Sequence, residues 1–111
     1  MAVKQSGLLY IEPSARVSAK PVIDTLTRKM AAAYRLSARG TTWRGWHRCA
    51  CGANSTNADY VLPGGAETNS LCVHYLAFHR SEVPAEQLAK VRRLNAGEVE
   101  PTEQELHGWK S

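Results

Sequence analysis

Long apolar stretches are missing from this sequence of 111 residues. No run approaches the roughly 18 apolar residues that a helix needs to span a membrane. Residues 1–15 hold one lysine and a short apolar run, too short for the core of a signal peptide. We therefore expect a chain with no membrane partner and a cytoplasmic location.

Cysteine is also scarce. There are three cysteines, and an odd number does not fit a framework of disulfides. Internal repeats and low-complexity tracts are missing as well. The composition is 43% hydrophobic and 22% charged, which is ordinary for a globular protein. These limits predict one compact domain, small enough for a bound metal to matter to its stability.

We expect this single domain, residues 1–111, to have three parts. Residues 1–45 form a strand and a basic helix, residues 46–80 a zinc-binding core, and residues 81–111 a helix and a tail. The expected fold class is α+β. Its centre is a hairpin and a buried helix, stapled by zinc into a small ββα-like unit.

Apolar periodicity and turn residues place the expected elements of the first part. Residues 8–11 (Leu-Leu-Tyr-Ile) form an apolar run that is closed by Pro13 and predicts a strand. Residues 21–39 predict a helix, because Pro21 suits its first turn and Gly40 suits the position just beyond its end.

The same signals place the remaining elements. Residues 43–51 and 59–62 predict the two strands of a hairpin, with the cysteines on one face of the first strand. Residues 71–80 are apolar nearly all round, which predicts a buried helix. A further helix is expected over residues 83–94, and residues 102–105 have the Thr-x-x-Glu form of a capping box.

The middle part holds all three cysteines and three of the four histidines. A structural zinc ion takes four thiolate or imidazole ligands in a tetrahedron. Cys49 and Cys51 supply two thiolates, and Gly52 allows a tight turn after them. His74 and His79 are five residues apart, within the H-x3–5-H spacing of structural zinc sites. These four residues are the expected ligands of Zn²⁺.

A second ligand set stays open, in which Cys72 joins the other two cysteines. Cys72 and His79 are separated by ~10.5 Å along a regular helix, which is barely within reach of one ion. The fourth ligand in this set would therefore be His74 or His47. A histidine beside Cys72 also leaves open a cysteine nucleophile.

Residues 46–80 resemble a zinc finger of the C2H2 type. The likeness rests on a cysteine-bearing hairpin followed by a helix of the form Leu-x-x-His-x-x-x-x-His, here from Leu71 to His79. The cysteines differ in being spaced C-x-C, and 22 residues separate Cys51 from His74. The resemblance implies a ββα unit around Zn²⁺ and covers about a third of the chain.

Charge is unevenly distributed, although the net charge is only +4. Residues 1–48 carry +7, residues 49–80 carry −1, and residues 81–111 carry −2. A basic first half suits an anionic partner, either nucleic acid or an acidic protein surface. The candidate contacts are six of the nine basic residues in residues 1–48 and one tryptophan: Arg28, Lys29, Arg35, Arg39, Trp43, Arg44 and Arg48.

Two tryptophans interleave with arginines in the sequence TTWRGWHR, residues 41–48. Aromatic rings beside guanidinium groups can stack on the bases of single-stranded nucleic acid. We expect Trp46 to pack in the core instead, while Trp43 fits either role equally.

The favoured function is a small structural-zinc module that acts by binding a macromolecule. The alternative is a zinc-dependent hydrolase or deaminase, which needs an open coordination position and a nearby carboxylate. The sequence contains neither H-E-x-x-H nor H-x-E paired with P-C-x-x-C. Asp59 and Glu67 are the only acids between residues 46 and 80.

Overall fold

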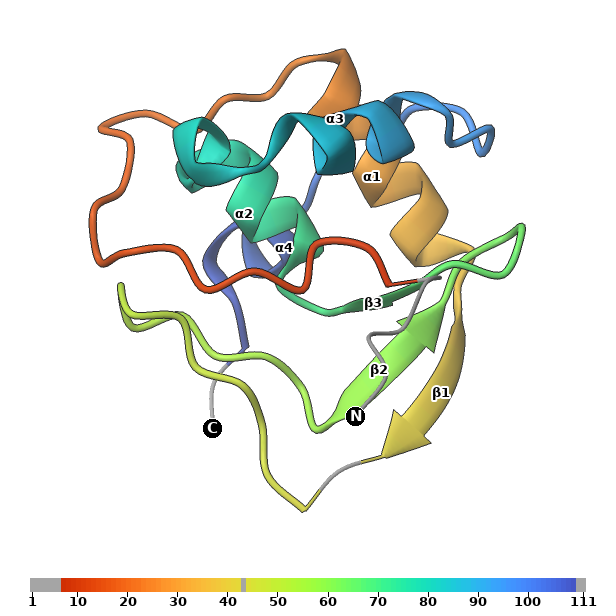
Figure 1. The fold of residues 1–111 in the computed structure, drawn as a ribbon, viewed down its shortest axis with the longest axis horizontal. Coiled ribbons are helices and arrows are strands. Elements are labelled where there is room, and N and C mark those ends of the chain that lie inside the picture. Colours follow the sequence, from red (N-terminus) through yellow and green to blue (C-terminus); the bar gives the residue numbers. More distant parts are fainter. Residues whose placement is uncertain (1–6, 43, 110–111) are drawn as a thin grey trace.

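The computed structural model describes residues 7–42 and 44–109 (Figure 1). Helices gather on one side of a three-stranded antiparallel sheet with the strand order β1-β2-β3. In chain order the elements are α1 (Thr25–Arg35), β1 (Ala38–Thr42), β2 (Ala58–Val61), β3 (Glu67–Asn69), α2 (Cys72–Phe78), the 3-10 turn η1 (Arg80–Glu82), α3 (Ala85–Arg92) and α4 (Glu103–His107). The predicted α+β class is confirmed.

Helix α2 is the centre of the core. All of its residues except Phe78 are buried, and it packs against both α1 and α4. Leu71, Tyr75 and Leu76 have no exposed surface. A helix with apolar residues on every side is stable only when other elements surround it. This is why the element that carries the histidines lies at the centre of the molecule.

Helix α1 is shorter than predicted at both ends. Its N-cap is Asp24, whose carboxylate accepts a hydrogen bond from the Thr27 amide at 3.2 Å. Pro21 therefore precedes the helix instead of opening it. At the other end, Arg39 belongs to β1 and pairs with Tyr60 of β2. Pairing within the sheet outweighs the helical propensity of these residues.

The predicted strand at residues 8–11 is wrong. Gly7 makes one parallel bridge to Glu67, and the Leu8 amide donates to the Glu67 carbonyl at 2.7 Å. Leu9 then has a φ of +59°, which turns the chain out of the extended conformation. Leu8 and Leu9 are both buried. The apolar run thus fills the core as an irregular segment.

The hairpin also differs from the prediction. β1 ends at Thr42, so a long connection, residues 43–57, carries the cysteines between β1 and β2. The glycine-rich turn after residue 62 is present, and it leads into β3, a strand that the sequence analysis missed. A β2-β3-α2 unit therefore exists, but the cysteines are outside its strands.

The C-terminal part follows the prediction closely. α3 lies within residues 83–94, and Thr102 and Glu105 form both hydrogen bonds of the capping box that begins α4. In the part of the chain that the structure describes, no helix is both long and apolar enough to cross a membrane.

Candidate metal centre

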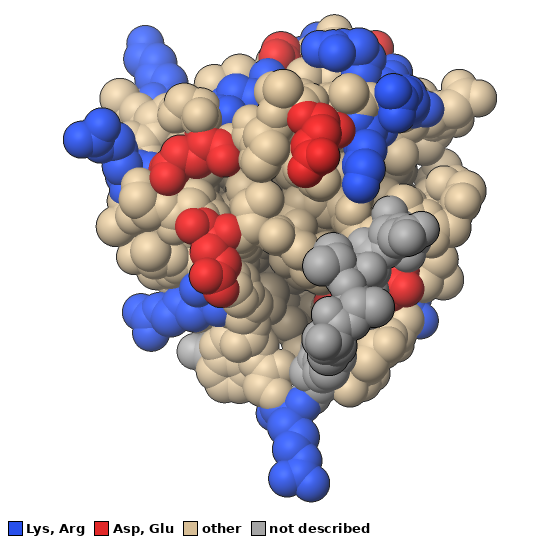
Figure 2. All heavy atoms as spheres, viewed as in Figure 1, with Lys and Arg blue, Asp and Glu red and all other residues tan. Residues whose placement is uncertain are grey.

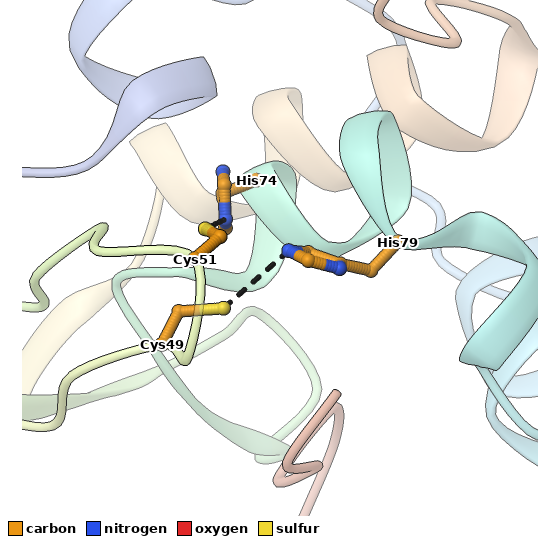
Figure 3. A group of neighbouring side chains, drawn as sticks. All are labelled: Cys49, Cys51, His74 and His79. Carbon is orange, nitrogen blue, oxygen red and sulfur yellow. Dashed lines mark hydrogen bonds between the residues drawn. The ribbon is translucent and has the colours of Figure 1, made fainter. Parts of the chain in front are cut away.

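Four side chains converge between the connection that follows β1 and the end of α2 (Figure 3). The ligand atoms of Cys49, Cys51, His74 and His79 all lie within 4.8 Å of one another. Cys49 Sγ is 3.4 Å from His79 Nε2, and Cys51 Sγ is 3.3 Å from His74 Nε2. In a tetrahedral zinc site, adjacent sulfur and nitrogen ligands are ~3.5 Å apart. The four residues are positioned to hold one metal ion.

A tight turn, and not a strand, brings the two sulfurs together. The Gly52 amide donates to the Cys49 carbonyl at 2.8 Å, and the Cys49 amide donates to the Ala53 carbonyl at 2.7 Å. Gly52 has a φ of +106°, a conformation that side-chain-bearing residues rarely adopt. The C-x-C-G sequence therefore sets the geometry through its turn.

The histidines meet because α2 ends between them. Five residues on a regular helix are ~140° apart around its axis, so both rings would not face one point. The helix ends at Phe78, and His79 has a φ of −124°. This change of direction returns the second ring to the first, with ring centroids 5.0 Å apart. The early end of α2 is thus part of the site.

Oxygen atoms face the other nitrogen of each imidazole. His74 Nδ1 is 2.7 Å from the Leu106 carbonyl, which can only accept a hydrogen bond. His79 Nδ1 is buried, and the Glu82 carboxylate faces it at 3.7 Å, beyond normal hydrogen-bond length. A proton on Nδ1 leaves the Nε2 lone pair directed at the cysteine sulfurs. Both rings are therefore oriented as metal ligands are.

Burial shifts the pKa of two members of the group, Cys49 and His74. It raises the pKa of the Cys49 thiol to about 11. Burial also lowers the pKa of His74, and the neighbouring His79 and His107 lower it further. A neutral imidazole is the form that binds metal, and a divalent cation would favour the thiolate that burial disfavours. A bound cation would therefore stabilise this donor set.

The alternative ligands lie outside this group. Cys72 is fully buried in the core, where burial raises the pKa of its thiol to about 12. His47 lies in the connection, and its backbone pairs with Ser55. Among the described residues, Cys49, Cys51, His74 and His79 are the one group of metal-binding side chains.

Sequence reasoning missed the two oxygen atoms that face the histidines. Glu82 follows His79 by three residues. A helical turn at this point would bring the two side chains together, so the spacing was a usable signal. The Leu106 acceptor is a main-chain carbonyl, and a main-chain atom leaves no signal in a side-chain pattern.

The cations of α1 that were predicted to contact a partner are engaged within the chain. Arg28 pairs with Glu98 at 3.2 Å, and Lys29 donates to the Arg92 carbonyl. Arg35 pairs with the buried carboxylate of Glu105 at 2.9 Å. These contacts join α1 to the C-terminal part of the chain. On the face shown in Figure 2, basic and acidic side chains are interspersed over the surface.

The remaining predicted contacts belong to the sheet edge and the connection. Arg39 donates to the Asn57 side chain at 2.7 Å from β1, and not from the helix in which it was expected. Arg44 and Arg48 are exposed. Trp43 lies outside the described residues. The prediction that Trp46 packs in the core is wrong, because 53% of this residue is exposed.

No protein-family model matches the chain, and comparison with curated proteins and with solved structures gave no match either.

Proposed function

We propose that the chain is a structural-zinc module that acts by binding a macromolecular partner. The observation that carries the proposal is the convergence of two sulfurs and two Nε2 atoms, with an oxygen facing each Nδ1. A tetrahedral set of two sulfurs and two nitrogens is typical of zinc. Three unpaired cysteines suit a reducing location such as the cytoplasm, where thiolates stay available to metal.

A structural role follows from the number and burial of the ligands. Four protein ligands complete a tetrahedron, whereas catalytic zinc keeps one position for water or substrate. Cys49, His74 and His79 are buried, and the ion would join the connection after β1 to the core helix α2. Binding energies of ~10–16 kcal/mol for structural zinc are large compared with the stability of a small domain.

The binding role is supported by charge. The chain has a net charge of +4, and its first half carries most of the positive charge. Such a surface attracts anionic partners, of which nucleic acid and acidic proteins are the two main classes. Arg44 and Arg48 of the connection are exposed candidate contacts, whereas the exposed Arg35 and Arg39 are bonded to Glu105 and Asn57.

Elemental analysis of the purified protein tests the metal. We expect one zinc per chain, and we expect Cys49→Ser and His79→Ala each to abolish its retention. Cys72→Ala is the matched control, because it removes a buried thiol outside the group and should retain zinc. The proposal is wrong if metal-free protein melts as the zinc-loaded protein does, or if zinc is lost from the Cys72 variant and kept by the His79 variant.

A further inference from the structure

The connection between β1 and β2 presents an aromatic ring between two cations. Trp46 is 53% exposed, and Arg44 and Arg48, two residues before and after it, are exposed as well. A single exposed apolar residue is common on protein surfaces and means little by itself. Here, the flanking positive charges and the anchoring of the segment indicate that Trp46 belongs to a binding surface. Residues 44–48 are called the tryptophan loop below.

The tryptophan loop is held firmly at its C-terminal end. The His47 amide donates to Ser55 Oγ at 2.7 Å, and the Ser55 amide donates to the His47 carbonyl at 2.8 Å. Arg48 forms an isolated antiparallel β-bridge with Asn54, and the next residue in the chain is Cys49 of the metal group. Fixing a loop before it binds lowers the entropy that binding costs. A metal at the site would thus stiffen the surface that carries Trp46.

Charge along the chain adds an independent argument. The sequence has no acidic residue between Asp24 and Asp59, a stretch that contains six Lys and Arg residues. The three cations that this stretch places on α1 are paired with the C-terminal part of the chain, as described above. A fourth cation, Arg39 of β1, donates to the Asn57 side chain, which leaves Arg44 and Arg48 of the tryptophan loop best placed to meet an anionic partner.

We propose that the tryptophan loop binds single-stranded nucleic acid, with the Trp46 indole stacked on a base and Arg44 and Arg48 at the flanking phosphates. Proteins that bind single-stranded nucleic acid combine exposed aromatic rings with nearby cationic side chains. A duplex covers the face of each internal base with its neighbours, so it offers no partner for the indole. An acidic protein surface would use the arginines but would not require the ring. This inference rests on the proposed binding role.

The test is the titration of the zinc-loaded protein, residues 1–111, against short labelled oligomers of single-stranded DNA and RNA at low salt. We expect Trp46→Ala to weaken binding by roughly tenfold to a hundredfold, and Trp46→Phe to restore much of the loss, because stacking needs only a ring. Leu36→Ala is the matched control, because Leu36 is also an exposed apolar residue (64%) and caps the C-terminal end of α1.

Salt dependence tests the arginines. Arg44→Gln should reduce the slope of log affinity against log salt by ~0.7, the value for one phosphate contact on a single strand. Arg93→Gln makes the same change of charge at an exposed position beyond α3 and should leave the slope unchanged.

Four results would overturn the inference. The first three are no binding to either oligomer at low salt, equal affinity of Trp46→Ala and the unchanged protein, and equal affinity for duplex and single strands. Binding of polyglutamate that does not depend on Trp46 would also overturn it in favour of an acidic protein partner. Zinc content and melting are measured on the same samples. A zinc-free protein whose binding depends on Trp46 thus refutes the structural-zinc role alone, and a zinc-loaded protein that binds no oligomer refutes the tryptophan loop alone.

Discussion

Glu82 offers the sharpest test of how the site orients its histidines. Its carboxylate accepts two hydrogen bonds from Ser14, at 2.9 Å from the amide and 3.0 Å from the hydroxyl. The same carboxylate faces His79 Nδ1 at 3.7 Å. Carboxylates that hold the non-ligating nitrogen of a histidine typically improve metal affinity by 10–100-fold. The 3.7 Å separation and the partial exposure of Glu82 place the expected effect at the lower end, about tenfold.

We therefore expect Glu82→Ala to raise the apparent dissociation constant for zinc about tenfold, and Glu82→Gln to raise it less. The glutamine retains an oxygen acceptor but loses the negative charge. The measurement is competition with a chromophoric zinc chelator at fixed pH and ionic strength. Glu86→Gln makes the same chemical change at an exposed position of α3 and should leave the dissociation constant for zinc unchanged.

Ser14→Ala separates orientation of the ring from attachment of the N-terminal segment. It removes the hydroxyl that bonds to Glu82 but leaves the carboxylate opposite His79. If Ser14→Ala weakens zinc binding as much as Glu82→Ala does, then Glu82 acts by attaching the segment. If neither variant changes the dissociation constant, the carboxylate has no role at His79 and the argument from its position fails.

Three further substitutions test the core and the helix ends. Leu76→Ala should lower the unfolding free energy by ~2–5 kcal/mol in urea denaturation, because Leu76 is completely buried. Thr102→Ala should cost ~1 kcal/mol by removing the capping hydrogen bond of α4, again in urea. Hydrogen bonds from Arg80 to the Asp24 carboxylate lower the pKa of Asp24. This pair therefore stabilises the fold above the unfolded-state pKa near 4, and the stabilisation is lost as the pH falls. Asp24→Asn keeps the cap but should reduce stability at pH 7 by ~0.5–1 kcal/mol, and by progressively less as the pH falls below 4; equal losses at pH 7 and pH 2 would contradict the assignment.

The elements that the sequence predicts correctly are those with a strong local signal. The apolar residues of α2 require burial on every side, and the capping box of α4 satisfies backbone groups locally. The elements it predicts wrongly depend on distant partners. Arg39 could extend a helix, but β2 pairs with it instead, and Leu9 leaves the extended conformation with its amide bonded to Gln87.

The same distinction applies to the candidate site. The spacing of the cysteines and histidines identifies the four residues, because two cysteines and two histidines at these separations match the ligand set of a structural zinc site. The spacing does not reveal that Cys49 and Cys51 occupy a turn, or that α2 must end before His79 for the rings to meet. Trp46 was predicted to be buried because tryptophan usually is. Only the path of the long connection shows that it is exposed.

The acceptor for His74 has a consequence for how the protein tolerates sequence change. Because the Leu106 acceptor is a main-chain carbonyl, it persists whatever side chain stands at that position, provided that α4 keeps its place. The place of α4 is fixed by the Thr102 cap and by the pairing of Glu105 with Arg35. Apolar substitutions at Leu106 should therefore spare the metal centre, whereas insertion of a single residue between the cap and Leu106 should move the carbonyl away. At this point, chain length is under tighter constraint than residue identity.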